Sequence, residues 1–389
     1  MKLKKSVTLL LCVLITTALL AACGGSTPTT SPPTEAAATT TSPSTEAATT
    51  TTSPPTEAAA TTAATTPSTA PEATEPAPTE AQVVEAGAPT VYVVIKAMGN
   101  AYWGILQAGA IDAGKDLGVN VIITGIPDEQ RIEDQITLLQ NAVSARADAV
   151  LIAVADSKAE APEVERAYDT GIPIILVDTM AETQKYTAAF VTDNYAAGEA
   201  AAKEMLRLLS EKGIPETQSG TIAVQIGSAG SQTIIDRDAG FKDYWDANAP
   251  EAWVVMWDKL QVNDGNIEKA VSIGQNVLTS EPELIAMFAP NNGSTVGFVT
   301  ALAEANRTDV VMVGFDFSPE MEGLIRGGQF TVSTMLQNQY FMGYNGVAAA
   351  LDIINGGSVP KDNDTGLTVV NASNVDDPEV IKAAYGGRG

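Results

Sequence analysis

The sequence predicts an α/β protein built from two doubly wound parallel-sheet lobes. Its 389 residues are 45% apolar and 18% charged, a globular composition with enough length for two lobes. From residue 90 onward, short apolar runs rich in β-branched residues alternate with helical stretches. These runs form two successive series, and near-continuous apolar strands separated by helices are typical of parallel sheets covered on both faces.

The first 22 residues are predicted to be an export signal. "MKLKK" is basic, and the apolar run that follows is too short for a membrane span. The run ends in "LAAC" (20–23), which resembles a bacterial lipobox. That resemblance implies that Cys23 becomes the lipidated first residue of an extracytoplasmic protein, anchored to the cell membrane at the cell surface or in the periplasm. An ordinary signal peptide with an incidental cysteine is the alternative.

Residues 23–88 are predicted to form a disordered tether. The segment consists mostly of Thr, Ser, Pro, Ala and Glu, and "TSPPTEAAATT" occurs at 30–40 and again at 52–62. It has too few large apolar residues to offset the entropy of ordering the chain.

The folded part then follows as ten predicted strands with helices between most of them. The first series comprises 91–96, 120–125, 149–154, 173–178 and 188–193. The second comprises 221–227, 252–258, 286–290, 310–316 and 331–336.

Charge and composition exclude several function classes. The formal charge of −25 argues against nucleic acid and anionic membrane surfaces as partners. Histidine is absent, which excludes Ser-His-Asp catalysis and histidine-bound metals. Both cysteines, Cys12 and Cys23, lie near the N-terminus, so the folded part holds no disulfide framework or cysteine-rich metal site. We expect no cofactor, no metal and no catalytic residues.

Polar side chains recur where the predicted strands end. Ligands of doubly wound proteins bind beyond the carboxyl ends of the strands, so these side chains are candidates for one binding crevice. Carboxylates, amides and guanidinium groups each make two directed hydrogen bonds, which match neighbouring hydroxyls. For Asp156 and Asn292, capping of the next helix is an equally good explanation. The candidates are Lys96, Asn100, Tyr102, Trp103, Asp156, Asp178, Arg237, Asn291, Asp316 and Gln337.

Two adjacent aromatics, Tyr102 and Trp103, follow the first predicted strand. An aromatic ring can cover the apolar C–H face of a sugar, so these rings are predicted to be buried against ligand. The alternative is core packing at the start of the next helix, and we expect at least one of the two rings to pack in this way.

A series of motifs, specific in its order and spacing, resembles a known family. The motifs are "NAYW" (100–103), "IPIILVD" (172–178), "VTDNYAAG" (191–198), "DRDAGF" (236–241), "MFAPNN" (287–292), "VGFD" (313–316) and "QNQYFMGYNGV" (337–347). Together they resemble the bacterial solute-binding proteins of sugar ABC transporters, in the ribose-binding-protein-like type 1 group. The similarity covers about residues 90–389.

The resemblance implies ligand contacts at Asn100, Tyr102, Trp103, Asp178, Arg237, Asn291, Asp316 and Gln337. Three positions depart from the ribose binders: Ala153 replaces an asparagine, Thr179 an arginine, and Gly265 lies where an aromatic is usual. Ribose itself is therefore not the expected ligand. Lys96 points to a subgroup that binds other sugars, cyclitols and sugar-derived signals; it either donates to ligand oxygens or pairs with Asp178 or Asp316.

The family also implies an organisation and a function. One lobe would comprise 89–192 and 337–365, the other 193–336 and 366–389, with three crossovers forming a hinge. We expect a monomer that captures a sugar or sugar-like polyol between its lobes and delivers it to an ABC permease in the membrane. A receptor that feeds a chemoreceptor or sensor kinase is the alternative.

Two other classes fit the sequence less well. A doubly wound enzyme should carry G-x-G-x-x-G or G-x-S-x-G after a strand, and neither motif occurs at these positions. A sugar-responsive repressor shares this fold but needs an N-terminal helix-turn-helix, where this chain has a leader and a tether.

Overall fold

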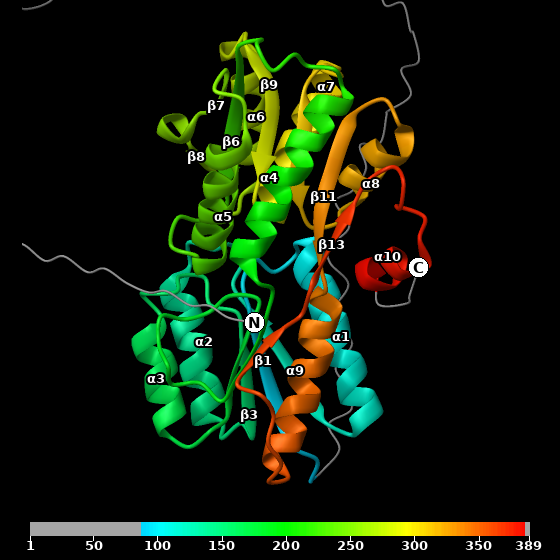
Figure 1. Ribbon diagram of the computed structural model, residues 1–389. Coiled ribbons are helices and arrows are strands. Elements are labelled where there is room, and N and C mark those ends of the chain that lie inside the picture. Colours follow the sequence, from blue (N-terminus) through cyan, green and yellow to red (C-terminus); the bar gives the residue numbers. More distant parts are fainter. Residues whose placement is uncertain (1–86, 386–389) are drawn as a thin grey trace, which may run out of the picture. The chain divides into compact units, whose positions relative to one another are not determined.

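The computed structural model describes residues 87–385, which form two α/β lobes (Figure 1). The predicted signal peptide, Cys23 and nearly all of the predicted tether lie outside the described residues. All described residues fall within one compact unit of the chain. Within residues 87–385, none of the helices has the length and apolar character needed to cross a membrane.

The sheet of the first lobe is entirely parallel. Its strands lie in the order β12-β5-β4-β3-β1-β2. They are β1 (Thr90–Ile95), β2 (Asn120–Gly125), β3 (Ala149–Ile152), β4 (Ile174–Val177), β5 (Ala188–Val191) and β12 (Asp362–Asp364). The four strands β1, β3, β4 and β5 are almost wholly buried, as strands covered on both faces must be.

The second lobe repeats this plan. Its strands lie in the order β13-β11-β10-β9-β6-β7, all parallel except β13, which runs antiparallel to β11; the short β8 (Gln261–Val262) pairs with β6. They are β6 (Gly220–Ile226), β7 (Trp253–Val255), β9 (Leu284–Ala289), β10 (Val311–Phe315), β11 (Thr331–Gln337) and β13 (Leu367–Val370).

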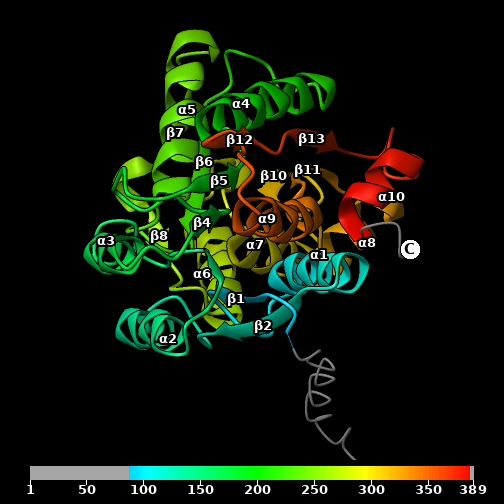
Figure 2. The ribbon, with the colours of Figure 1, turned by 90° about the horizontal axis from the view of Figure 1, so that it is seen from below.

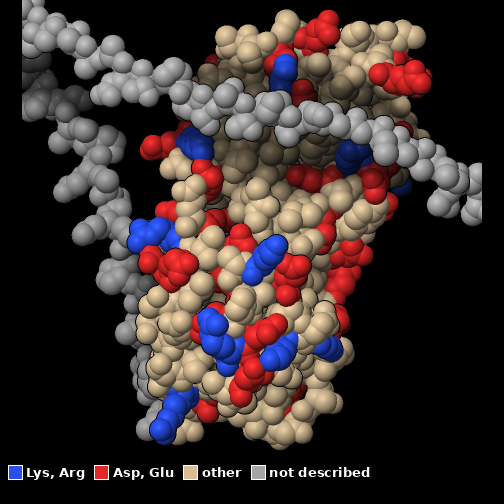
Figure 3. Space-filling model, turned by 90° about the vertical axis from the view of Figure 1, so that its left-hand side faces the viewer, with Lys and Arg blue, Asp and Glu red and all other residues tan. Residues whose placement is uncertain are grey.

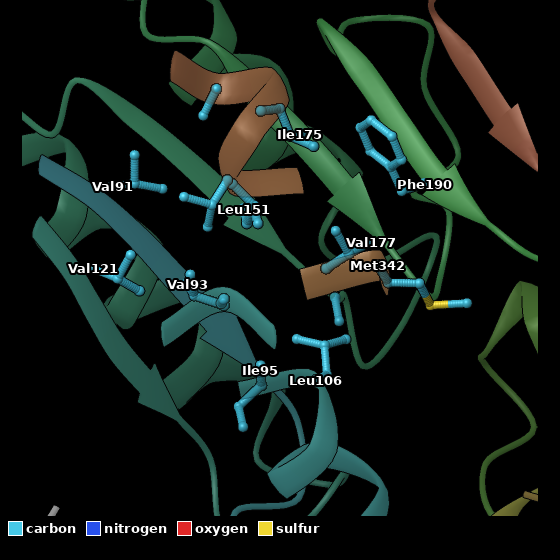
Figure 4. Close-up of a cluster of buried hydrophobic side chains, with 14 of the residues drawn as sticks. Val91, Val93, Ile95, Leu106, Val121, Leu151, Ile175, Val177, Phe190 and Met342 are labelled. Atoms are coloured by element: carbon cyan, nitrogen blue, oxygen red, sulfur yellow. The ribbon is translucent and has the colours of Figure 1, made fainter. Parts of the chain in front are cut away.

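Helices cover both faces of the first sheet. They are α1 (Ala101–Leu117), α2 (Ile132–Ser144), α3 (Ala161–Asp169) and α9 (Gln339–Ile354). Successive strand residues point to opposite faces, so Val93 packs toward α1 and α9 with Leu106 and Met342, while Val94 packs toward α2 and α3 with Leu139 (Figures 2 and 4). The two clusters form the core of this lobe.

The second sheet is sandwiched in the same way. Its helices are α4 (Asn194–Glu211), α5 (Gln232–Asn248), α6 (Ile267–Ser280), α7 (Asn292–Ala305), α8 (Pro319–Gly327) and α10 (Pro378–Tyr385), with a 3₁₀ turn η1 (Trp257–Lys259) after β7. Phe241 of α5 stacks on Phe288 of β9 with ring centroids 4.1 Å apart. On the other face, Phe298 of α7 and Met321 of α8 pack on Met312.

The chain passes between the lobes three times, at residues 192–193, 338 and 365–366. The passages are hydrogen-bonded to one another. Thr192 donates to the Gln337 side chain at 3.0 Å, and Asn338 donates to the Thr365 carbonyl at 2.5 Å. Three short, mutually bonded connections are the arrangement expected of a hinge.

The fold class predicted from the sequence is confirmed, with local differences. The predicted strand 252–258 is shorter, because only Trp253–Val255 pairs with β6 and Trp257 begins a 3₁₀ turn. Strands β8, β12 and β13 were not predicted. They are short edge strands of two to four residues, and β12 reads "DND", which carries no apolar signal.

The excess of acidic residues is spread over the surface. On the face shown in Figure 3, Asp and Glu side chains lie across both lobes with Lys and Arg between them. This face offers no broad basic patch of the kind that binds nucleic acid.

Candidate functional site

A small cavity lies where the strand ends of the two lobes meet. Its volume is about 40 Å³, and its walls come from both lobes. The lining residues are Lys96, Asn100, Tyr102, Trp103, Glu129, Asp178, Ser231, Thr233, Ile234, Arg237, Asn291, Asn292, Gly293, Asp316 and Gln337. The structure thus brings together every residue proposed from the sequence except Asp156.

Arg237 is a buried cation, only 1% exposed. Its Nε donates to Asn194 at 3.0 Å and its Nη1 to the Pro290 carbonyl at 2.7 Å, and its guanidinium carbon lies 4.1 Å from the ring centroid of Phe315. These contacts fix the plane of the group, while Nη2 has no partner among the described residues. Burial lowers the Arg237 pKa, and the carboxylates of Asp316 and Asp178 oppose that shift.

Asp316 faces Arg237 from the end of β10. Gln337 donates to its Oδ1 at 2.8 Å and accepts from Thr192 at the first passage between the lobes. Burial raises the pKa of Asp316 to about 6, against the lowering effect of Arg237 and of the Gln337 hydrogen bond. One wall of the cavity is therefore linked directly to the hinge.

Asp178 anchors the opposite wall at the end of β4. Tyr102 donates to its Oδ1 at 2.6 Å and Thr179 to its Oδ2 at 2.5 Å. Lys96 donates to Thr179 at 3.0 Å and lies 3.8 Å from Asp178 Oδ2. The predicted pairing of Lys96 with Asp178 is thus present, and donation to ligand oxygens stays a prediction.

Asp178 and Asp316 have the same unusual backbone. Their φ angles are +64° and +69°, in the left-handed region that few residues other than glycine adopt. Each directs its carboxylate into the cavity immediately after a parallel strand. Aspartate tolerates this conformation better than most residues, and such strain tends to occur at functional sites.

Both aromatics of the first segment are buried, with 3% exposure each. They lie in the first turn of α1, which Asn100 caps by accepting from the Tyr102 amide at 2.9 Å. The rings meet edge to face with centroids 4.9 Å apart and belong to the core cluster of the first lobe. Core packing therefore holds for both rings, and each also forms part of the cavity wall.

Four buried polar atoms around the cavity lack hydrogen-bond partners among the described residues. They are Ser231 Oγ, Arg237 Nη2, Asn291 Oδ1 and Asn292 Nδ2. Buried polar atoms are almost always paired in folded proteins, so four orphans around one cavity mark a place for a polar ligand. The set holds donors, an acceptor and a hydroxyl that can serve as either.

Asp156 has a local role instead. Its Oδ1 accepts from the amides of Lys158 and Ala159 at 3.0 and 2.8 Å, and it faces Gly230 of the other lobe. It is not among the cavity-lining residues, and it does not cap α3, whose N-cap is Glu160. Its carboxylate instead closes the turn at residues 156–159.

Six lining residues are not among the candidates predicted from the sequence. Two of them, Ser231 and Asn292, are polar residues that follow predicted strands, and helix capping is the alternative given for Asn292. Thr233, Ile234 and Gly293 sit in first helical turns that carry no polar pattern. Glu129 lies on the turn after β2. The polar stretch "PDEQ" (127–130) at that strand end was the available signal.

Two lobes with a polar cavity at their facing strand ends define a solute-binding protein of the periplasmic type. Residues 91–358 match the family model of the periplasmic binding protein domain. The chain belongs to this family, in its ribose-binding-protein-like group, as the sequence motifs indicated.

Curated relatives are of similar sequence. A D-allose-binding periplasmic protein of Escherichia coli is 28% identical over 276 residues, which cover 68% of this chain and 84% of that protein. A D-ribose/D-allose-binding protein of Pseudomonas aeruginosa is 29% identical over 282 residues, which cover 69% of this chain and 83% of that protein.

Solved structures show the same fold. A carbohydrate transporter solute-binding protein from Agrobacterium radiobacter, in complex with D-arabinose, has a TM-score of 0.72 and 28% identity, covering 77% of this chain and all of that one. An ABC transporter solute-binding protein from Agrobacterium vitis with bound D-fucose has a TM-score of 0.68 and 31% identity. The match covers 75% of this chain and 98% of that one. These relatives are binding proteins, so the chain belongs to a non-enzymatic family whose members act outside the cytoplasm.

Proposed function

We propose that this protein captures a monosaccharide or a sugar-like polyol between its lobes and delivers it to an ABC permease. The observation that carries the proposal is the ring of unpartnered polar atoms around one buried cavity. Asp178 and Asp316 supply acceptors from opposite lobes, and Arg237 supplies a fixed donor. Neighbouring hydroxyls of a sugar offer both donors and acceptors, which suits this set.

Related proteins support the same ligand class. Those described above are binding proteins for D-allose or for D-ribose and D-allose, or are complexes with D-arabinose or D-fucose, and all four sugars are neutral monosaccharides. Thr179 and Gly265 stand where ribose binders carry an arginine and an aromatic. The proposed ligand is therefore a neutral sugar or cyclitol other than ribose.

Closure of the two lobes around the ligand explains how the solute is delivered to the permease. Ligand contacts to both lobes are made together only in the closed form, so ligand shifts the population toward it. A permease that binds the closed form preferentially then receives loaded protein.

Calorimetric titration with pentoses, hexoses and cyclitols tests this function. We expect at least one neutral sugar to bind, and Arg237→Lys to weaken that binding at least tenfold, because lysine loses the fixed fork of donors. Arg166→Lys, at an exposed arginine that pairs with the buried Glu163 outside the cavity, is the matched control and should bind like the wild type. A wild-type protein that binds no member of the panel would contradict the proposal.

We also propose that Cys23 anchors the protein by lipid and that residues 23–88 act as a flexible tether. The support is the basic leader, the apolar run and "LAAC", followed by a composition that cannot build a core. Cys23→Ser should move the protein from the membrane fraction to the soluble fraction in fractionated cells. Equal membrane retention of the variant and the wild type would refute the anchor.

A further inference from the structure

We propose that Glu129 is a ligand-contacting residue that closes the cavity mouth and selects neutral hydroxylated ligands over anionic ones. The inference rests on the proposed function, because it assigns a role in the same cavity. Glu129 belongs to none of the motifs that carry the family resemblance.

A short turn between β2 and α2 holds Glu129 in place. Asp128 accepts from the Gln130 amide at 3.1 Å through its carboxylate, and from the Arg131 amide at 3.3 Å through its carbonyl. At the start of the turn, the Met98 amide donates to the Ile126 carbonyl at 2.7 Å. The half-buried Glu129 side chain lines the cavity beside Lys96 and Trp103.

The opposite lobe meets this turn at Gly265. A Cβ placed on Gly265 would lie 3.5 Å from Glu129 Cγ and 3.7 Å from the Glu129 amide nitrogen. Gly265 has a φ of +75°, and its amide donates to Asn263 Oδ1 at 2.9 Å. The neighbouring Gln130 hydrogen-bonds the carboxylate of Asp264. Glu129 thus occupies the space beside Gly265, and it contacts both lobes only when they are closed.

The Glu129 carboxylate has no hydrogen-bond partner within the described part of the chain. Burial raises its pKa, Lys96 opposes that shift, and Asp178 adds to it. Lys96 is itself bonded to Thr179 and paired with Asp178, so it does not satisfy Glu129. A half-buried carboxylate in this setting gains a partner when a ligand hydroxyl donates to it.

The charges around the cavity give the selectivity. Glu129, Asp178 and Asp316 face it with Lys96 and Arg237 as cations. Lys96, the cation that acts on Glu129, is already bonded to Thr179 and paired with Asp178. Arg237 keeps its unpartnered Nη2, but it belongs to α5 of the second lobe. An anionic group at the Glu129 end would meet a second carboxylate without a free cation to balance it. Like charges at close range in a half-buried site are strongly unfavourable.

The test compares the wild type with Glu129→Gln and Glu129→Ala, and with Glu133→Ala, at an exposed glutamate in the first turn of α2, as a matched control. The neutral probes are D-allose, D-arabinose, D-galactose and D-fucose, and the anionic probe is D-galacturonate, which differs from D-galactose only at C6. Affinities come from calorimetry, and melting temperatures without sugar check that every variant is folded.

We expect Glu129→Ala to weaken binding of the tightest neutral sugar at least tenfold, and Glu133→Ala to change it less than threefold. Glu129→Gln should lower the preference for neutral sugar over D-galacturonate at least tenfold. If Glu129→Ala binds like the wild type, or if Glu129→Gln leaves the preference unchanged, the inference is overturned while the proposed function stands. If the wild type binds none of these probes and no other member of the panel of pentoses, hexoses and cyclitols, both fall together.

Discussion

Glu160 is a carboxylic acid that the fold buries completely, just before α3. Its Oε1 accepts from the amides of Ala155 and Asp156 at 2.8 and 3.0 Å, while Oε2 has no partner among the described residues. Burial raises its pKa to about 7, and the two amide hydrogen bonds only partly oppose this effect. The native state therefore favours a proton on Glu160 that the unfolded chain does not hold at neutral pH.

We predict a pH-dependent stability that traces to this residue. The Glu160 pKa is near its usual 4.5 in the unfolded chain and about 7 in the folded one. Its contribution is complete below pH 4.5 and is lost as pH rises through 7, so the free energy of unfolding should fall over that window, by on the order of 3 kcal/mol. Glu160→Gln should make the profile measured by urea unfolding from pH 5 to 8 less steep, and the raised pKa values of Asp238, about 7, and Asp316, about 6, account for the slope that remains. Exposed Glu320→Gln is the control, and parallel wild-type and Glu160→Gln profiles would disprove the assignment.

Much of the candidate site could be proposed from residue types and strand ends. Arg237, Asp178 and Asp316 follow buried strands in sequence, and the topology rule places such residues at one crevice. The positive φ of the two aspartates, the orphaned Nη2 of Arg237 and the approach of Glu129 to Gly265 depend on tertiary contacts. No local pattern encodes them.

At the scale of elements, the two lobes pack their paired helices in the same way. A Cβ on Gly109 of α1 would lie 2.0 Å from the Tyr340 carbonyl oxygen of α9, and one on Gly240 of α5 would lie 2.0 Å from the Tyr195 carbonyl oxygen of α4. Tyr195 in turn donates to Asp243 at 2.8 Å, as Tyr340 does to Asp112 at 3.0 Å. Each helix leaving the hinge thus lies in close backbone contact with the helix that begins at the cavity.

Gly109→Ala should therefore destabilise the protein by about 1–3 kcal/mol or more, because the added methyl has no space without separating α1 from α9. Gly104→Ala in the same helix is the control: a Cβ there meets nothing within 4 Å, and alanine favours helix by up to about 1 kcal/mol. Urea unfolding of both variants measures the difference. Equal effects of the two substitutions would show that close helix packing is not the reason for the glycine.

The helices and the central strands were largely predictable from the sequence, whereas the short strands at the sheet edges were not. Apolar runs such as 149–154 and 310–316 identify central strands because both faces are buried. Strand β12 holds polar residues and β13 runs antiparallel at the sheet edge. Their pairing depends on the passage at residues 365–366, which lies between them and takes the chain from one sheet to the other.

At the scale of the molecule, direct hydrogen bonds join the two lobes beside the cavity. Thr233 of the second lobe donates to the Asp178 carbonyl at 3.1 Å, and its hydroxyl lies 3.1 Å from that of Thr179. Ser157 donates its amide to the Gly230 carbonyl at 3.1 Å and accepts from the Gln232 amide at 2.9 Å. A cavity of about 40 Å³ holds only a few water molecules, so a sugar enters only when these contacts open.

The last prediction concerns these interlobe bonds. Ser157→Ala and Thr233→Val each remove hydroxyl hydrogen bonds that exist only in the closed form, so each should shift the sugar-free protein toward the open form. The apparent affinity for sugar falls as a smaller fraction of the sugar-free protein is closed. We expect each substitution to weaken binding of the tightest neutral sugar three- to tenfold. Ser157 is the sharper probe, because it lies outside the cavity wall and its loss removes no ligand contact.

Spin labels at Glu133→Cys and Glu268→Cys, exposed positions on α2 and α6, report the lobe separation in a background that carries both Cys12→Ser and Cys23→Ser. Without sugar, the distance distribution of both variants should move to longer values than that of the wild type, and saturating sugar should restore the short distance. Thr279→Val removes a hydroxyl bonded only within α6 and is the matched control. Unchanged distances in Ser157→Ala and Thr233→Val would mean that ligand contacts alone, and not the direct interlobe bonds, hold the closed form together.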